Sequence, residues 1–193
     1  MLILFLIFFC FLQTNASHIR AGEITAKRIS NTSFTFEITL VVYTKTSSTI
    51  PIDSATIKAS DGWSSKVPFS SSASVGNDVT KTEYKTTHTF NAGQIIISFR
   101  DQNRVGGVLN MDNSSNTAFY VETMLILDPL IGLNNSPKLL VPPIDDGSTN
   151  QIYNYNPGAF DSDGDSLSYE MDIPMSEAAT LVVNYKDPGG FFS

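Results

Sequence analysis

Regular alternation of apolar and polar side chains is the feature that most limits how this chain can fold. Over residues 34–43, every second side chain is apolar: Phe34, Phe36, Ile38, Leu40 and Val42. Successive side chains of a strand point to opposite faces, so this pattern predicts a long half-buried β-strand. Further strands are predicted at residues 55–59, 81–90, 94–99 and 118–127, with Trp63 starting another after the turn Asp61-Gly62.

This spacing of strands and turns is typical of one fold class. About seven strands in roughly 110 residues is the count expected of a β-sandwich. No stretch shows the 3.6-residue period of an amphipathic helix. The sequence therefore predicts an all-β protein whose first domain is an immunoglobulin-like β-sandwich.

The first residues are apolar almost without a break, from Leu2 to Leu12, and a polar patch that closes on Ala16 follows. The run is too short to span a bilayer comfortably as a helix. It predicts a signal peptide at residues 1–16, cut before Ser17; an uncleaved anchor is the alternative. The single cysteine, Cys10, lies in this leader, so a disulfide scaffold is excluded. We expect a secreted or cell-surface protein that is not inserted in a membrane after cleavage.

A short acidic loop, Asp161-Ser162-Asp163-Gly164-Asp165, lies in a stretch without basic residues. Eight carboxylates fall between Leu139 and Tyr185, with no Lys or Arg among them. Carboxylates at close range repel one another, and Ca²⁺ accepts about six to eight oxygen ligands in flexible geometry. The loop predicts a structural Ca²⁺ site with Asp161, Asp163 and Asp165 as ligands. A solvated acidic turn is the alternative.

The loop does not follow the EF-hand pattern. With Asp161 as the first position, Ser166 stands where that loop needs Gly, and Asp172 where it needs Glu. The residues that follow also alternate as in a strand, with Leu167, Tyr169 and Met171 at every second position. An ion here would stiffen a loop or a junction between domains.

Prolines and small polar residues mark a connector between two predicted domains. Asp128-Pro129, Asn134-Asn135-Ser136-Pro137 and Pro142-Pro143 lie close together, and proline cannot donate to a sheet ladder. The predicted order is a β-sandwich at 17–128, a linker at 129–143, and a partial second domain at 144–193. Those last residues are too few for another sandwich, so we expect a fragment of a longer protein.

The linker asparagines are candidate ligands as well. Asn134 and Asn135, and less strongly Asp128, could share an ion with the acidic loop at the junction. Ordinary turn chemistry is the alternative for the asparagine pair, since Asn tolerates left-handed backbone geometry.

Two resemblances rest on these motifs. The linker Asn-Asn-Ser-Pro followed by the loop and Ser166-Leu167-Ser168-Tyr169 resembles a cadherin-like repeat, which implies calcium shared at the junction and the start of a second, cadherin-like β-sandwich. Several stretches resemble gliding-motility-associated exported proteins that use the type IX secretion system. The matching stretches are residues 17–24, 97–104, 110–114, 119–123 and 156–165. This resemblance implies an adhesin-like or structural role in cell adhesion, without naming a ligand.

Charge and motifs exclude several function classes. A net charge of −7 argues against nucleic acid and anionic membrane surfaces as partners. The chain has no Gly-x-Ser-x-Gly, His-Glu-x-x-His or phosphate-loop motif, so we expect no enzyme. The predicted function is a calcium-stiffened surface protein with an unknown protein or polysaccharide ligand. The alternative is a non-catalytic polysaccharide-binding module, for which three coplanar exposed aromatic rings on one sheet face would be evidence.

Overall fold

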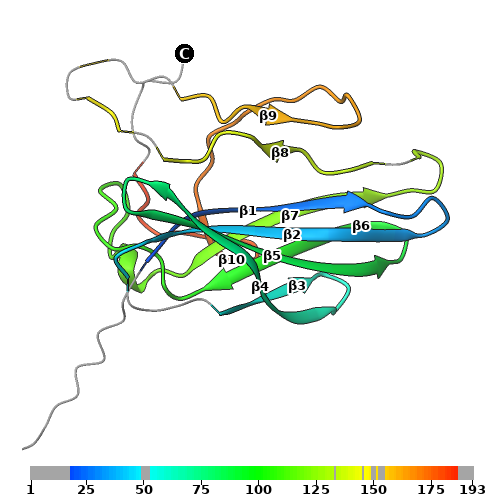
Figure 1. The fold of residues 1–193 in the computed structure, drawn as a ribbon, viewed down its shortest axis with the longest axis horizontal. Helices are drawn as coiled ribbons and strands as arrows, with labels where there is room; N and C mark the ends of the chain where they lie inside the picture. The colour runs from blue at the N-terminus through cyan, green and yellow to red at the C-terminus, as the bar shows by residue number, and fades with distance from the viewer. Residues whose placement is uncertain are drawn as a thin grey trace, which may run out of the picture.

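The computed structural model of the protein describes residues 18–48, 53–132, 134–144, 146–148, 151 and 155–186. These residues form a seven-stranded antiparallel sheet and two small two-stranded sheets (Figure 1). The strands of the large sheet are β1 (Ile19–Arg28), β2 (Phe34–Lys45), β3 (Ser54–Ala59), β4 (Ser64–Gly76), β5 (Val79–Phe90), β6 (Gly93–Asp101) and β7 (Phe119–Leu127). The all-β class is thereby confirmed.

Within the described ranges there is no long apolar helix of the kind that crosses a bilayer. The predicted leader, residues 1–16, lies outside them.

The strands are ordered β1-β2-β5-β4-β3-β6-β7. Strand β4 belongs to both halves of this order. Its first part, Ser64–Pro68, pairs with β3, and its second part, from Phe69 to Gly76, pairs with β5. Strand β2 pairs with β5 in continuous register, and β1 pairs with β2 with one register shift, between Ile19 and Ala21.

The inward faces of the two halves share one hydrophobic core. Alternation in β2 buries Phe36, Ile38 and Leu40, each at most 1 % exposed, while their neighbours in sequence point outward. The opposite half contributes buried residues from β3, β6 and β7, including Ile57 and Ile97. Burial of each such side chain contributes about 1.5–3 kcal/mol through the hydrophobic effect, which explains why the period-two pattern fixes the register.

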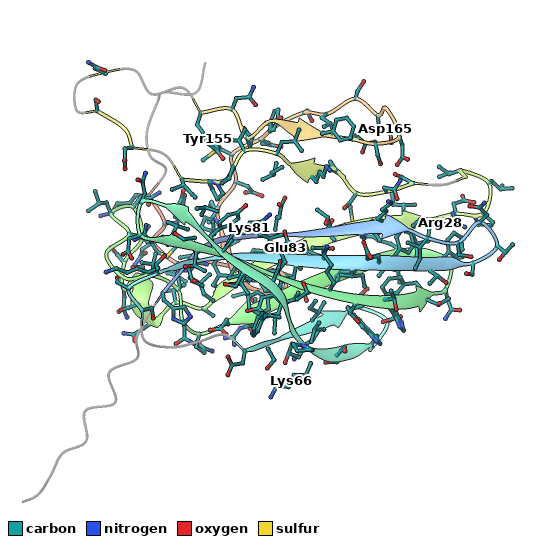
Figure 2. The ribbon with its side chains drawn as sticks, viewed as in Figure 1. Arg28, Lys66, Lys81, Glu83, Tyr155 and Asp165 are labelled. Atoms are coloured by element: carbon teal, nitrogen blue, oxygen red, sulfur yellow. The ribbon has the colours of Figure 1, made fainter. Side chains whose placement is uncertain are left out.

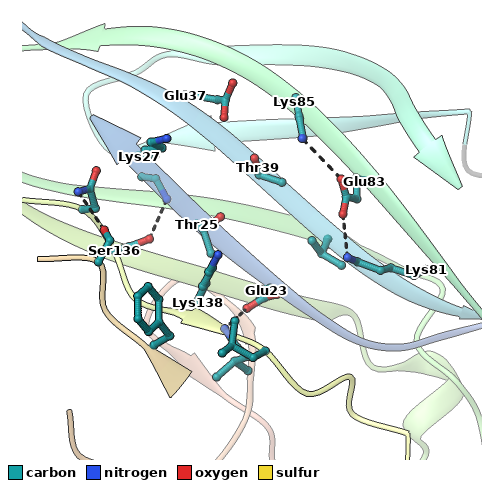
Figure 3. A pocket seen from close by; sticks show the side chains of 17 residues that line it. Glu23, Thr25, Lys27, Glu37, Thr39, Lys81, Glu83, Lys85, Ser136 and Lys138 are labelled. Atoms are coloured by element: carbon teal, nitrogen blue, oxygen red, sulfur yellow. Dashed lines mark hydrogen bonds and ion pairs between the residues drawn. The ribbon is translucent and has the colours of Figure 1, made fainter. Parts of the chain in front are cut away.

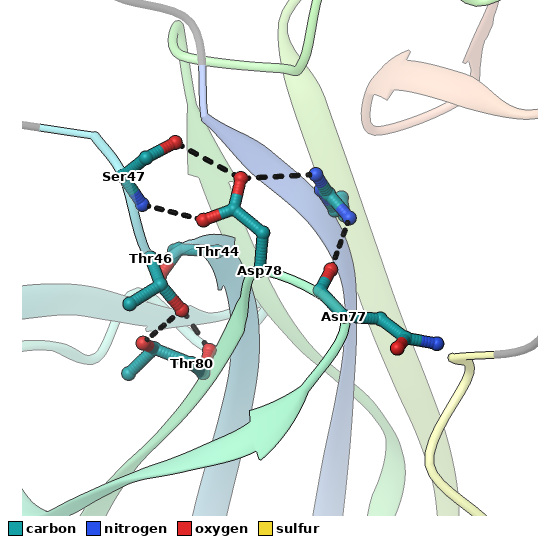
Figure 4. Close-up of polar contacts among 7 residues, drawn as sticks. Thr44, Thr46, Ser47, Asn77, Asp78 and Thr80 are labelled. Carbon is teal, nitrogen blue, oxygen red and sulfur yellow. Dashed lines mark hydrogen bonds and ion pairs between the residues drawn. The ribbon is translucent and has the colours of Figure 1, made fainter.

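A two-residue turn, Asn77-Asp78, joins β4 to β5 (Figure 4). Both residues have positive φ, 47° and 55°, as a hairpin turn matched to strand twist requires. The Asp78 carboxylate accepts hydrogen bonds from the Ser47 backbone N–H (2.8 Å) and the Ser47 hydroxyl (2.9 Å). Arg20 lies 3.8 Å from the same carboxylate. These bonds connect the turn to the chain that leaves β2.

The remaining described residues form short elements beside the large sheet. A 3₁₀ turn, Ser114–Asn116, precedes β7. Strand β8 (Lys138–Leu139) pairs with β9 (Ala159–Phe160), and Figure 1 shows both lying along the outside of β1. Strand β10 (Met175–Glu177) pairs with β11 (Thr180–Leu181).

Two expectations about the C-terminal part were wrong or incomplete. The strand predicted after the acidic loop is not formed, because residues 164–174 are extended without strand pairing and Tyr169 and Met171 are more than half exposed. The predicted linker at 129–143 contains β8, so it is in part a paired strand.

Candidate functional site

The short β8–β9 pair brings the linker and the acidic loop together. Lys138 pairs with Phe160, and Leu139 with Ala159, in antiparallel orientation. In such a pair, the residues that precede the first strand and those that follow the second lie at the same end. The linker residues 134–136 and the loop at 161–165 therefore meet, as the junction hypothesis requires.

Asn135 makes the central contact of this junction. Its backbone N–H donates to Asp163 Oδ2 (2.6 Å), and its side-chain Nδ2 donates to Asp163 Oδ1 (2.8 Å) and Ser162 Oγ (3.2 Å). Both oxygens of the Asp163 carboxylate are thus bound by protein donors. Hydrogen bonds to a carboxylate offset part of the charge repulsion within the loop.

The same linker segment is bound to the large sheet. The Arg28 N–H donates to Asn135 Oδ1 (2.7 Å), and the Ala26 N–H donates to Ser136 Oγ (2.7 Å). The Ser136 N–H returns a bond to the Ala26 carbonyl (2.9 Å). Strand β1 ends the strand order, so the linker satisfies backbone groups that would otherwise be open at a sheet edge. Figure 2 shows Arg28 and Asp165 at the same end of the molecule.

A hollow of about 300 Å³ lies beside these contacts, between the linker, the loop and the end of β7. Four of the predicted ligands line it: Asn134, Asn135, Asp161 and Asp165. Asp165 makes no hydrogen bond or ion pair with any described residue, while Asp161 Oδ1 accepts the Asp163 N–H (2.7 Å). The lining oxygens come from carboxylates, amides and the nearby Ser166 hydroxyl. These hard oxygen donors fit Ca²⁺ in kind.

The other two candidates, Asp163 and Asp128, do not line the hollow. Asp163 does not line the hollow because its carboxylate is turned to Asn135. No three His, Cys, Asp or Glu side chains of the described residues are grouped closely enough to hold a metal by themselves. Asp128 accepts the Leu130 N–H (2.8 Å) in a local turn away from the hollow. Asn135 is not among the described residues with positive φ.

Aromatic side chains on the surface are scattered. The strongly exposed rings of the described residues are Phe69, Tyr155, Phe160 and Tyr169, and they come from β4 and three separate places in the C-terminal part. Trp63 stacks on His88 with ring centroids 4.6 Å apart and packs against the core. These rings do not form a coplanar strip on one sheet face, which would be the sign of a carbohydrate module.

Sequence reasoning missed the contacts to the β1 edge. They join residues 107 and 110 positions apart, and nothing in the local pattern of Ala26 or Arg28 marks them. Comparison of the chain with protein-family models, curated proteins and solved structures gives no match.

Proposed function

We propose that this chain is part of a secreted, adhesin-like structural protein of a cell surface, whose interdomain junction is stiffened by Ca²⁺. The observation that carries the proposal is the double attachment of Asn135, to the Arg28 N–H of the large sheet and to the Asp163 carboxylate of the acidic loop. A cation next to Asn135 would strengthen a joint that already exists. No catalytic role is proposed.

Strand order supports a finer description of the first domain. The halves β1-β2-β5-β4 and β3-β6-β7 have the order of the two sheets of a seven-stranded immunoglobulin-like sandwich. We infer such a sandwich at residues 17–128, followed by the start of a cadherin-like repeat. The approach of the linker asparagines to the acidic loop favours the second inference.

Asp161 and Asp165 would hold the ion, with Asn134 supplying an amide oxygen. Bound Ca²⁺ would supply positive charge to a loop that carries three carboxylates. Asp163 and Asn135 would act next to the ion by holding loop and linker in place through the bonds described above. The mechanism is mechanical, because it fixes the angle at which the C-terminal part leaves the sandwich.

The proposed location is the cell exterior. More specifically, the protein would lie on the surface of a cell that moves by gliding. The exterior location is supported by the apolar leader at residues 1–16, the net charge of −7 and the absence of cysteine after the leader. N-terminal sequencing of the exported protein tests it. A mature chain that begins at Ser17 is expected, and a retained leader would contradict it.

Thermal unfolding with and without Ca²⁺ tests the ion site. Extracellular calcium modules bind with a Kd on the order of 0.1–1 mM, so about 10 mM Ca²⁺ stabilises the folded state by up to about 2.7 kcal/mol. For a chain of this size, that corresponds to a rise in Tm of about 5–10 °C. The same concentration of Mg²⁺ should raise Tm far less, because Mg²⁺ keeps most of its water.

Variants connect the effect to the hollow. Asp165→Asn removes a carboxylate that has no partner among the described residues, so it should abolish the Ca²⁺ shift without lowering Tm in chelator. Glu170→Gln removes a charge from the same acidic stretch but outside the hollow, and should keep the shift. No Ca²⁺ shift in the folded parent protein, or equal loss in both variants, would refute the proposed site.

A further inference from the structure

A groove of about 510 Å³ lies on the other side of the linker, between β8–β9 and the outward face of β1, β2 and β5 (Figure 3). Its volume is in the range of about 300–1,000 Å³ that is usual for small-ligand sites. The linker is held over this face by the Ser136 contacts to Ala26 and by the Leu139 N–H, which donates to Glu23 Oε2 (3.1 Å).

The floor of the groove is a regular array of polar side chains. Strand register places Thr25 opposite Thr39, and Thr39 opposite Lys85. In the next row, Lys27 lies opposite Glu37. Side chains on one face of a sheet repeat about every 7 Å along a strand and about 5 Å across strands. Hydroxyl, ammonium and carboxylate groups therefore alternate in two directions.

The groove differs in charge from the rest of the chain. Four lysines and three glutamates line it, although the chain as a whole has a net charge of −7. Glu83 is bound by Lys81 (2.7 Å) and lies 3.7 Å from Lys85. Lys27 and Glu37 make no ion pair or hydrogen bond with described residues, so both side chains are available to a ligand. The site is locally positive on an acidic protein.

One aromatic ring and one lysine form the opposite side. Phe160 of β9 is 48 % exposed, and Lys138 Nζ lies 5.7 Å from its ring centroid. Leu139 and Leu140 add a small apolar surface. Glu23 beside them is partly buried, and that burial raises its pKa while the Leu139 N–H opposes the rise. Glu23 holds the linker in place through this hydrogen bond.

We propose that this groove binds an acidic saccharide chain. A sugar hydroxyl both donates and accepts, so it can bond Glu37, Thr25 and Thr39 in one arrangement. Carboxylates of acidic sugars would pair with Lys27 and Lys138, and the Phe160 face would pack against a sugar ring. This proposal deepens the surface role proposed above and rests on it.

An acidic peptide fits the groove less well. Its carboxylates only accept hydrogen bonds and would be repelled by Glu37, so only backbone N–H groups of the peptide could donate to that residue. Peptide grooves also gain affinity from several apolar pockets or from an open strand edge. Here Phe160 is the one aromatic lining residue of the described chain, and the β1 edge beside the groove is already bonded to the linker.

Calorimetric titration in calcium-free buffer with chelator tests the proposal. The probes are oligogalacturonate, cello-oligosaccharide of equal length, and a poly-glutamate peptide. Oligogalacturonate should bind, cello-oligosaccharide about tenfold more weakly, and the peptide not measurably. Because no Ca²⁺ is present, the result is independent of the Tm experiment, and failure here leaves the calcium proposal standing.

Matched lysine variants locate the binding. Lys27→Ala and Lys138→Ala should each weaken oligogalacturonate about two- to fivefold, as loss of one partly exposed ion pair would. Lys66→Ala is the control, because Lys66 is exposed on β4 away from the groove (Figure 2). No oligogalacturonate binding, equal binding of the neutral sugar or the peptide, or an equal effect of the Lys66 variant would overturn the inference.

Discussion

The attachment of the linker to β1 predicts a large local effect of one substitution, Asn135→Ala. The change removes the side-chain oxygen that accepts the Arg28 N–H. It also removes the side-chain amide that donates to the Ser162 hydroxyl and to the Asp163 carboxylate. A neutral hydrogen bond contributes about 0.5–1.5 kcal/mol and one to a charged group about 1.5–3 kcal/mol. Water replaces part of this at an exposed site, so we expect the junction to lose about 2 kcal/mol of opening free energy.

Amide hydrogen exchange measures this loss directly. Opening of the junction exposes the Arg28 N–H, and about 2 kcal/mol corresponds to roughly 30-fold faster exchange at that amide. Asn134→Ala is the matched control, since the Asn134 side chain makes no hydrogen bond with described residues. Amides of the core strands, such as Ile38, should keep their protection in both variants, because the core does not depend on the linker.

Two outcomes would refute this reasoning. Unchanged exchange at Arg28 in the Asn135 variant would mean that the linker does not rest on the β1 edge in solution. Equal acceleration in the Asn134 variant would mean that the effect comes from general loosening of the segment rather than from the Asn135 bonds.

Two further predictions concern the large sheet. Gly22→Ala should cost about 1–3 kcal/mol, because the new Cβ would lie 2.8 Å from the Val41 carbonyl oxygen; an unchanged midpoint in urea unfolding would contradict it. The hydrogen bond from the Ser47 hydroxyl is the main cause that lowers the pKa of Asp78 in the folded state. The charged Asp78 carboxylate therefore stabilises the fold at pH values above its unfolded pKa. This stabilisation is lost as the pH falls through the lower pKa of the folded state. Ser47→Ala should raise the pKa of Asp78 in an NMR titration, and an unmoved titration would show that the hydroxyl bond is absent in solution.

Alternation in the sequence predicted strands correctly only where partner strands were available. Alternation at residues 34–43 gave the expected strand because β1 and β5 flank β2 on both sides. Equally regular alternation at Leu167–Met171 formed none, since strand propensity is realised only against partner strands and a buried face. The Ser-rich part of β4 is the opposite case, because it forms a strand that propensity did not indicate. Pairing with β5 supports this strand, as does the hydrogen bond from Ser70 Oγ to the Glu83 carbonyl (2.9 Å).

The candidate site was predictable in part for a similar reason. Acid density and the resemblance to junction motifs pointed to the loop and the linker asparagines, and the structure brings them together. The division of roles among them could not be read from the sequence. Which aspartate faces the hollow and which faces Asn135 depends on Gly164, whose φ of +84° reverses the chain within the loop.

Asn135 and Ser136 line both the 300 Å³ hollow and the 510 Å³ groove. If a molecule bound on one side fixed these two residues, it would change the free energy of association on the other side. Thermodynamic linkage requires the two influences to be equal in size, whichever molecule arrives first. A surface protein built in this way would adjust its hold on a target to the ionic composition of its surroundings, and the target in turn would retain the ion.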